Sequence, residues 1–388
     1  MTRNMIYLDN AATSFPKPRE VYEFMNSFYQ ACGANPGRAG HAMTLETEEV
    51  VFQTRKMLCD MFNGTDPARL TFSYNATDSL NIIINGMLSK GDHVITSCLE
   101  HNSVLRPLYH KEQEGFIEVT YVPFNAAGYI HPEDIKSNIK RNTKMVILNH
   151  ASNVLGTVQP AAEVGKICRE EGIYFALDAS QTAGIIKIDV QEMNIDLLAF
   201  TGHKSLLGPT GIGGSYVAEN VPIHATRFGG TGVRSGQRTH LEEFPYRLES
   251  GTLNILGVAG LNAGQKWIRD KGMLQLHRQE MHLWSRLKKG LSAIGGVVFH
   301  CADDPEIHTA VLSFTIDKWK SGDVGTILGA HYRIACRTGL QCAPLVHEML
   351  GTDKFGGTVR FSLGPFNTEE HIDKAVEAMR KIAAIEKR

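Results

Sequence analysis

The fold is decided by residues 174–214, which have the sequence YFALDASQTAGIIKIDVQEMNIDLLAFTGHKSLLGPTGIGG. Two short apolar runs, residues 173–177 and 197–200, each end in a cluster of polar residues. Short apolar runs of this kind are typical of buried parallel strands. Ligands of open α/β sheets bind beyond the carboxyl ends of the strands, so we expect Asp178 and Lys204 to face one crevice.

A carboxylate and an amine in one crevice suggest a site for pyridoxal 5'-phosphate (PLP). A lysine can hold the aldehyde of PLP as a Schiff base, and a carboxylate can keep the pyridine nitrogen protonated, so that the ring accepts electrons. Gln181 and His203 stand at the same two strand ends. The alternative for Asp178 and Lys204 is a buried ion pair or two exposed charges, because strand ends often carry such residues.

The composition indicates an ordinary globular protein. Its 388 residues predict two or three domains at roughly 150 residues each. Basic and acidic residues nearly cancel, at 40 and 41, which argues against nucleic acid or an anionic membrane as a partner. We expect a cytoplasmic protein, because residues 1–10 lack the apolar core of a secretory signal and no run approaches a membrane helix.

The seven cysteines show no metal-site spacing, and no metal is expected. A chain of this size does not need disulfides, so most of these side chains are expected to be buried, unreactive thiols. The cysteines are Cys32, Cys59, Cys98, Cys168, Cys301, Cys336 and Cys342.

A strand at 70–72, a turn and a helix at 78–87 follow one another near the start of the chain. Backbone N–H groups at the start of such a helix, with the Thr77 hydroxyl nearby, can bind a phosphate. The alternative is that Thr77 only caps the helix.

Further polar residues follow predicted strands at 93–96 and 145–148. His101 lies just beyond the first, where its imidazole stacks on a cofactor ring, moves protons, or is an ordinary surface histidine. Asn153 lies in the polar segment after the second. Several strands with polar residues at the same end indicate a mostly parallel sheet with a site at that end.

From about residue 256 the pattern indicates a smaller α+β domain. Cys342 lies in a loop, where a thiol is either reactive or inert. Arg360 lies among apolar residues of a predicted strand at 358–362, so it requires a partner, either a substrate carboxylate or an internal salt bridge. The elements predicted here are helices at 276–294 and 324–328 and strands at 297–300, 310–314, 333–336 and 358–362.

Across nearly its full length the sequence resembles the class V aminotransferase-fold cysteine desulfurases. The motifs that carry this resemblance, in order, are Tyr7-Leu8-Asp9-Asn10-Ala11-Ala12, Ala76-Thr77, Glu100-His101, Ser152-Asn153, Asp178-Ala179-Ser180-Gln181, Gly202-His203-Lys204, residues 249–254, Arg337-Thr338-Gly339 with Cys342-Ala343, and Arg360. The resemblance implies the α/β fold of fold type I PLP-dependent transferases, with a mostly parallel seven-stranded sheet, helices on both faces and a smaller α+β C-terminal domain. The expected parts are an N-terminal segment at 1–18 that packs on the small domain, a PLP-binding domain at 19–255 and a small domain at 256–388.

The resemblance also implies a role for each motif residue. Lys204 would hold the cofactor aldehyde, Asp178 would contact the pyridine nitrogen, and His101 would stack over the ring and take part in catalysis. Gln181 would contact the ring hydroxyl, and Asn153 would also bind the cofactor. The phosphate would be held by Ala76, Thr77, Thr201 and His203 and, from the other subunit of a homodimer, by Thr252. The implied substrate residues are Asn10, Ala11, Asn153 and Arg360, and Cys342 would accept the sulfur.

The expected activity is the PLP-dependent conversion of L-cysteine to L-alanine, with a persulfide on Cys342 that passes sulfur to an acceptor protein. The loop at 337–339 resembles that of the group with Suf-type desulfurases and selenocysteine lyases, although Leu340 and Gln341 replace two histidines that are usual there. The alternatives are a selenocysteine lyase, a class V aminotransferase or epimerase that leaves Cys342 unused, and a non-catalytic protein that binds PLP.

Overall fold

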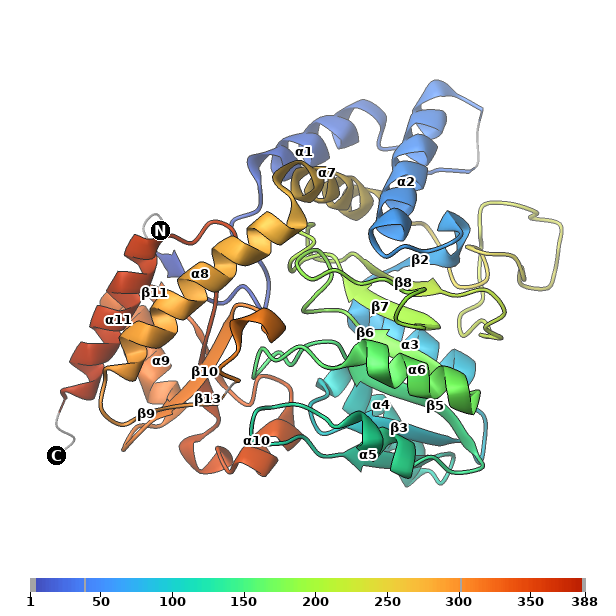
Figure 1. Ribbon diagram of the computed structural model, residues 1–388. Coiled ribbons are helices and arrows are strands. Elements are labelled where there is room, and N and C mark those ends of the chain that lie inside the picture. The colour runs from blue at the N-terminus through green and yellow to red at the C-terminus, as the bar shows by residue number, and fades with distance from the viewer. Residues whose placement is uncertain (1–4, 38–39, 301, 386–388) are drawn as a thin grey trace.

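The computed structural model describes residues 5–37, 40–300 and 302–385. These residues form a larger lobe, at the right in Figure 1, and a smaller lobe at the left. Each lobe has its own apolar core. In the described ranges, no helix is long and apolar enough to cross a membrane.

The described residues of the larger lobe form a seven-stranded sheet with the order β2-β8-β7-β6-β5-β3-β4. Strand β8 runs antiparallel to both of its neighbours, and the other neighbouring strands run parallel. The predicted mostly parallel seven-stranded sheet is therefore confirmed. The strands are β2 (Leu70–Ser73), β3 (His93–Ser97), β4 (Glu118–Val122), β5 (Thr143–Asn149), β6 (Tyr174–Asp178), β7 (Leu197–Thr201) and β8 (Gly213–Val217).

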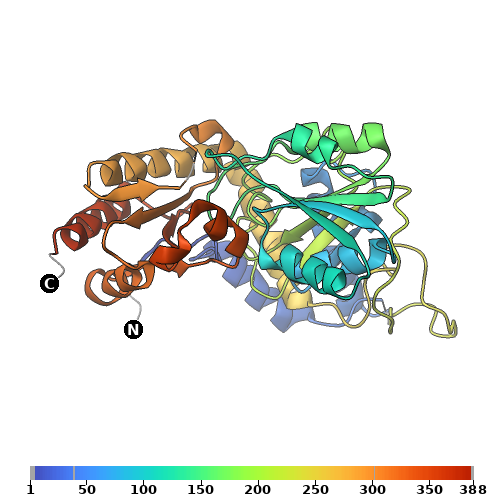
Figure 2. The ribbon, with the colours of Figure 1, turned by 90° about the horizontal axis from the view of Figure 1, so that it is seen from below.

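Alternate residues of the central strands pack into two separate apolar cores, one on each face of this sheet. In β5, Met145 and Ile147 belong to one core, and Val146 and Leu148 belong to the other. A strand covered on both faces has no polar side, which explains the continuous apolar runs in the sequence. Figure 2 shows helices on both sides of the sheet. Helices α3 (Ala76–Met87) and α4 (Asn102–Gln113) contribute to the first core, and α2 (Ala42–Met61), α5 (Pro132–Ser137) and α6 (Ala161–Glu171) to the second.

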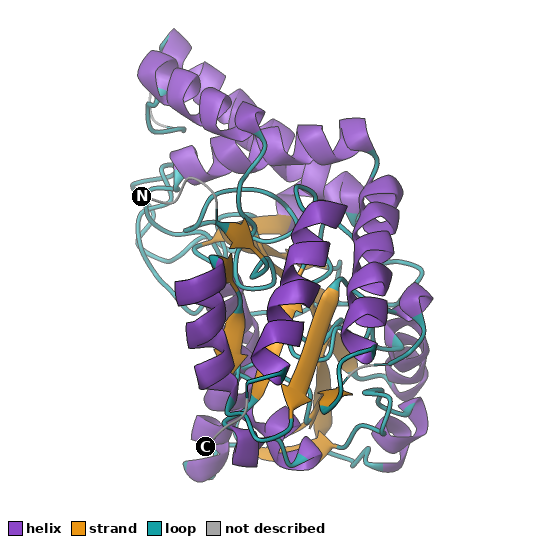
Figure 3. Cartoon of the chain, turned by 90° about the vertical axis from the view of Figure 1, so that its left-hand side faces the viewer, coloured by secondary structure: helices purple, strands orange, loops and turns teal. Residues whose placement is uncertain are grey.

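The smaller lobe contains an antiparallel sheet with the order β12-β13-β10-β9. The start of the chain joins this lobe, because β1 (Ile6–Tyr7) pairs in parallel with β11 (Ile334–Ala335). Figure 3 shows this lobe nearest to the viewer, with helices beside its strands. Its elements are β9 (Val297–Phe299), β10 (Val311–Ile316), β12 (Arg337–Gly339), β13 (Thr358–Ser362), α8 (Met273–Ser292), α9 (Ser321–Tyr332), α10 (Pro344–Leu350) and α11 (Glu369–Ala383).

Helix α7 (Ile255–Lys271) is absent from the sequence prediction. It packs against α2 and α1 (Arg19–Cys32) and is buried on most of its surface. Such a helix lacks the polar face that reveals helical periodicity, and its glycines lower its helix propensity. A Cβ atom on Gly260 would come within 2.6 Å of the Met25 sulfur, so glycine permits the close approach of α7 to α1.

A buried ion pair holds the long segment between β8 and α7 against the large sheet. Arg55 of α2 contacts Glu249 through Nη1 and Oε1 at 2.7 Å and through Nη2 and Oε2 at 3.1 Å. Both side chains are only 7% exposed. Glu249 Oε1 also accepts a hydrogen bond from the Phe72 N–H of β2 at 2.6 Å, so this carboxylate ties the loop to a strand and to a helix.

Replacing Arg55 by methionine is expected to lower the free energy of unfolding by about 3–5 kcal/mol, because the Glu249 carboxylate would stay buried without its counter-charge. Urea denaturation measures this change. Arg19→Ala is the matched control, since Arg19 pairs with Glu23 on the surface and such pairs contribute less than about 1 kcal/mol. Equal effects of the two substitutions would contradict the structural role of the buried pair.

Candidate active site

A cavity of about 320 Å³ lies at the carboxyl ends of the parallel strands, and residues from both lobes line it. Asp178 and Lys204 both lie in its wall, as expected from the two strand ends. The lining residues are Ala11, Ala12, Asn75, Ala76, Thr77, His101, Ser103, Asn149, Ala151, Asn153, Asp178, Ser180, Gln181, Thr201, His203, Lys204, Arg337, Gln341, Cys342 and Arg360.

Asp178 and Lys204 differ in how the protein holds them. Asp178 ends β6, and its Oδ1 accepts hydrogen bonds from the N–H and the hydroxyl of Ser180. Lys204 follows β7, and burial lowers the pKa of its amine to about 8, although the Asp178 carboxylate opposes this shift. The carboxylate is therefore fixed in place, and the amine is partly deprotonated near neutral pH, as a nucleophile requires.

The Thr201 and His203 side chains fit one end of a phosphorylated ligand. Thr201 Oγ1 and His203 Nδ1 are buried polar atoms without a hydrogen-bond partner in the described part of the chain. Burial lowers the pKa of His203 to about 4, and the neighbouring lysines add to this shift. The imidazole is thus neutral and can donate one N–H. Buried polar atoms normally have partners, so these two atoms are suited to phosphate oxygens.

The start of α3 lies in the same cavity wall. Asn75 caps this helix, because its Oδ1 accepts a hydrogen bond from the Asp78 N–H at 3.0 Å. Thr77 lies inside the first turn, so the alternative in which Thr77 caps the helix is wrong. The first N–H groups of a helix lack intrahelical acceptors and attract anions. The start of α3, with Ala76 and Thr77, is therefore suited to an anion.

His101 caps α4 from the wall of the cavity. The Ser103 N–H donates to His101 Nδ1 at 3.0 Å, so a neutral ring carries its proton on Nε2. Burial lowers the pKa of His101, and the Lys204 ammonium adds to this shift. A neutral imidazole is compatible with stacking on an aromatic cofactor, and its low pKa makes it a weak base.

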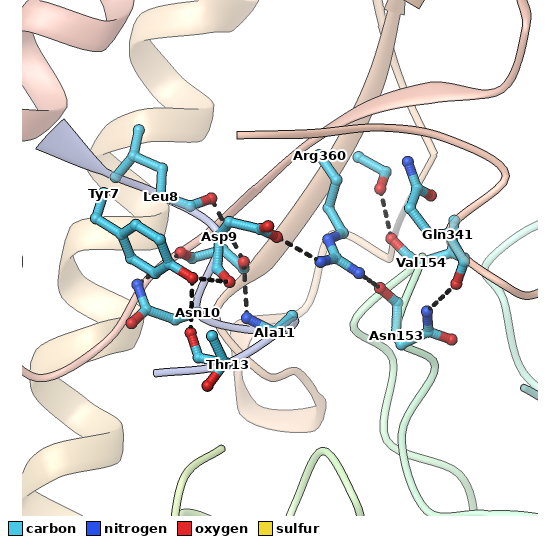
Figure 4. Close-up of polar contacts among 12 residues, drawn as sticks. Tyr7, Leu8, Asp9, Asn10, Ala11, Thr13, Asn153, Val154, Gln341 and Arg360 are labelled. Carbon is cyan, nitrogen blue, oxygen red and sulfur yellow. Dashed lines mark hydrogen bonds and ion pairs between the residues drawn. The ribbon is translucent and has the colours of Figure 1, made fainter. Parts of the chain in front are cut away.

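Arg360 has internal partners in addition to its place in the cavity. Nη2 pairs with Asp9 Oδ1 at 2.8 Å, and Nη1 donates to the Asn153 carbonyl at 2.8 Å, as Figure 4 shows. The side chain is only 3% exposed. The internal salt bridge considered from the sequence is therefore present. A guanidinium has five N–H donors, and Nε has no partner within the described residues, so binding capacity remains.

Cys342 differs from the other described cysteines because it is exposed and lines the cavity. Burial raises the pKa of Cys59 and Cys98 to about 11 and that of Cys168 and Cys336 to about 12, which makes these thiols unreactive. Cys301 lies outside the described residues. Cys342 follows β12, so the smaller lobe presents it to a cavity whose Lys204 comes from the larger lobe.

Two predicted site residues lie away from this cavity. The Asn10 side chain donates to the Ser362 carbonyl and to Asn367 Oδ1, and it faces a smaller neighbouring cavity. Thr252 lines surface pockets of the segment between β8 and α7. Neither residue lines the cavity that contains Lys204 of the same chain.

Asn75 and Ser180 line the cavity but are missing from the sequence prediction. The signal for Ser180 is present, since an aspartate side chain often accepts a hydrogen bond from the backbone N–H two residues further on. The signal for Asn75 is its position just before a helix, where asparagine is a preferred cap.

The comparisons with known proteins show the family of this chain. Residues 6–375 match the family model described as aminotransferase class-V. A probable cysteine desulfurase of Methanothermobacter thermautotrophicus is 32% identical over 390 residues, which cover 99% of this chain and 96% of that protein. The apo structure of a cysteine desulfurase from Thermococcus onnurineus superposes with a TM-score of 0.91 at 32% identity, covering 98% and 94% of the two chains.

A crystal structure of the Escherichia coli cysteine desulfurase CsdA superposes with a TM-score of 0.86 at 28% identity, covering 97% and 94% of the two chains. The nearness to Suf-type enzymes stays a prediction, and the relatives also include the Escherichia coli cysteine desulfurase IscS, at 31% identity over 399 residues. The full-length matches and the composition of the cavity agree, and the chain belongs to the cysteine desulfurases of the aminotransferase class-V family, which are PLP-dependent enzymes.

Proposed function

We propose that this protein converts L-cysteine to L-alanine and collects the sulfur as a persulfide on Cys342. One observation carries the proposal: a single cavity contains a lysine with a lowered pKa, a fixed carboxylate, a buried arginine and an exposed thiol. The first two groups suit PLP, the arginine suits a carboxylate, and the thiol suits sulfur transfer.

The residues of the cavity suit each part of the cofactor. Lys204 would bind the aldehyde, Asp178 would pair with the pyridine nitrogen, and His101 would stack on the ring. PLP, when bound, supplies a ring that accepts electrons from the substrate Cα. The remaining residues proposed to hold it are Gln181, Asn153, Ala76, Thr77, Thr201 and His203.

We propose that Arg360 binds the substrate carboxylate and Lys204 moves the Cα proton. Arg360 and Ala11 line the cavity, and the Arg360 Nε–H is without a partner in the described ranges. Lys204 is the better base, because its pKa of about 8 is close to neutral pH, whereas the His101 Nδ1 is engaged by the Ser103 N–H. Asn10 remains a candidate only for an indirect role through its neighbours.

The sulfur step needs no further reactant. The Cys342 thiolate attacks the substrate sulfur, and the bond between that sulfur and Cβ breaks. The electron pair of this bond stays with the carbon part of the substrate, and protonation there gives alanine. The Cys342 persulfide then passes its outer sulfur to an acceptor protein, or to a small thiol that releases sulfide and becomes oxidised to a disulfide.

Product analysis tests this function. Purified protein with PLP, L-cysteine and dithiothreitol is expected to release alanine and sulfide in equal amounts. Alanine and selenide from L-selenocysteine, without products from L-cysteine, would indicate a lyase instead. A keto acid would indicate an aminotransferase, a D-amino acid would indicate an epimerase, and the absence of any product would indicate a non-catalytic PLP protein.

The rate at which apo-protein captures PLP is expected to rise with pH by about tenfold per unit below pH 8 and to level off above it. Only the deprotonated Lys204 amine attacks the aldehyde, and its pKa is about 8. Stopped-flow absorbance between pH 6 and 10 measures this rate. A profile that keeps rising to the ordinary lysine pKa of 10.5 would contradict the lowered pKa.

We also propose a homodimer in which Thr252 contacts the phosphate in the other subunit. Thr252 lies outside its own cavity, in surface pockets beside Tyr74 and Phe52, and both aromatic side chains are exposed. Exposed aromatic residues around a pocket are typical of interfaces.

Light scattering is expected to give the mass of a dimer at micromolar concentration, and Thr252→Ala is expected to weaken PLP binding about tenfold, since it removes one hydrogen bond to a charged phosphate. Equilibrium dialysis measures the affinity for PLP. A fully active monomer would contradict this assembly.

We also propose a cellular location and a division of the chain into three parts. A cytoplasmic location is supported by the free state of all the described cysteines, which is typical of a reducing compartment. A division into parts 1–18, 19–255 and 256–388 is supported by the pairing of β1 with β11, although α7 packs on α1 and α2.

A further inference from the structure

The Cys342 thiol stands on a turn with an unusual backbone. Gln341 and Cys342 have φ angles of +43° and +60°, a left-handed conformation that residues other than glycine rarely adopt. The turn is closed by a hydrogen bond from the Ala343 N–H to the Leu340 carbonyl at 2.9 Å. Two consecutive left-handed residues persist only where surrounding contacts hold them.

The side chain of Gln341 supplies such contacts. It is 5% exposed. Its Nε2 donates to the Thr358 carbonyl at 3.0 Å, and its Oε1 accepts from the Thr358 hydroxyl at 3.2 Å. Thr358 is fully buried at the start of β13. The amide of Gln341 is thus satisfied on both sides by one residue of a core strand, which fixes the turn to that strand.

The main chain of the turn is held from the larger lobe as well. Asn153 Nδ2 donates to the Gln341 carbonyl at 2.7 Å, and the Asn153 carbonyl accepts from Arg360, so Figure 4 shows a continuous chain of contacts from Arg360 to Gln341. The Asn102 N–H of α4 donates to the Cys342 carbonyl at 2.7 Å. The backbone on both sides of the thiol therefore has a partner.

We propose that Gln341 is a positioning residue that holds the Cys342 thiol at the cavity through its paired hydrogen bonds to Thr358. This inference rests on the proposed role of Cys342 as sulfur acceptor. Leu340, the neighbour of Gln341, points a half-exposed side chain outward and contributes no side-chain hydrogen bond to the turn.

The test compares Gln341→Met with Leu340→Ala. Methionine has nearly the volume of glutamine but makes neither hydrogen bond, and loss of two hydrogen bonds is expected to lower kcat for alanine formation about tenfold. The KM for L-cysteine is expected to change by less than about threefold, because Arg360 keeps its contacts with Asp9 and with the Asn153 carbonyl. Leu340→Ala alters the same turn without touching the clamp, and it is expected to keep the wild-type kcat.

Hydrogen exchange supplies a readout that does not depend on the reaction. In PLP-loaded Gln341→Met, the amides of Ala343 and Asn102 are expected to exchange faster than in the wild type, because both donate hydrogen bonds to carbonyls of the turn. Unchanged exchange or an unchanged kcat would overturn the proposal. If Cys342→Ser kept full activity while Gln341→Met still loosened the turn, the sulfur-acceptor role would fail and the clamp would stand.

Thr358→Val keeps the proposal testable if Gln341→Met does not fold. Valine preserves the shape of threonine and removes only the hydroxyl, so one of the two bonds of the clamp is lost. The expected fall in kcat is about threefold, with faster exchange at Ala343. The double variant is expected to be no slower than Gln341→Met alone, since both changes break one clamp. Multiplicative effects would show that the two residues act separately and would overturn the proposal.

Discussion

The Lys204→Ala protein is expected to lose its borohydride-reducible link to PLP and at least about 1,000-fold in activity. Lys204 is the amine in the cavity wall, and burial lowers its pKa to about 8. Alanine removes both the covalent attachment and the proposed base for the Cα proton. Asp178 and the proposed phosphate contacts remain, so the variant is expected to bind PLP non-covalently and more weakly.

Lys17 provides a matched control. Its amine is also partly buried, with a pKa lowered to about 8 by burial, and it donates to the His203 carbonyl at 2.6 Å, next to Lys204. Lys17 does not line the cavity. After borohydride reduction and mass spectrometry, Lys17→Ala is expected to carry the PLP label on Lys204. A label on the Lys204→Ala protein would show that another amine holds the cofactor.

Much of the cavity was predictable because parallel strands end at the same edge of a sheet. A polar residue after each apolar run is therefore close to the polar residues after the others. Asp178 ends β6 and Lys204 follows β7, which are neighbours in the sheet, and His101 follows β3, two strands beyond β6. Local sequence patterns are sufficient for this kind of inference, since the sheet itself brings the residues together.

The contacts made by the smaller lobe were not predictable in the same way. Arg360 and its partner Asp9 are 351 positions apart, and no local pattern signals such a pair. The clamp between Gln341 and Thr358 likewise depends on how β12 and β13 are paired. Helix α7 was missed for a different reason, because a helix buried on most sides loses the alternation of polar and apolar residues that marks helices in sequence.

Replacing Cys342 by serine is expected to lower the production of sulfide from L-cysteine at least about 1,000-fold while PLP binding stays normal. Cys342 is the exposed thiol at the cavity, and the other described cysteines are buried or half-buried. Serine is nearly isosteric, so lost packing cannot explain a large loss of rate. A hydroxyl is not ionised near neutral pH and cannot attack the substrate sulfur as a thiolate does.

The absorbance spectrum of the bound cofactor shows which step of the reaction the Cys342→Ser substitution blocks. Adding L-cysteine to the Cys342→Ser protein is expected to change the PLP absorbance as in the wild type, because Lys204, Asp178 and Arg360 are unaltered. Sulfide and alanine are measured in the same samples. Cys336→Ser is the matched control, since the Cys336 thiol is half-buried and burial raises its pKa to about 12, and it is expected to keep its activity.

Activity on L-selenocysteine shows whether the Cys342 thiol is needed to cleave the bond to sulfur. Selenium leaves carbon more readily than sulfur, so Cys342→Ser is expected to retain part of any activity on L-selenocysteine even where desulfuration is lost. That difference would locate the role of the thiol in the cleavage of the carbon–sulfur bond. Wild-type sulfide and alanine production by Cys342→Ser would instead disprove the persulfide step on Cys342 and favour a lyase-type cleavage of the carbon–sulfur bond in the same cavity.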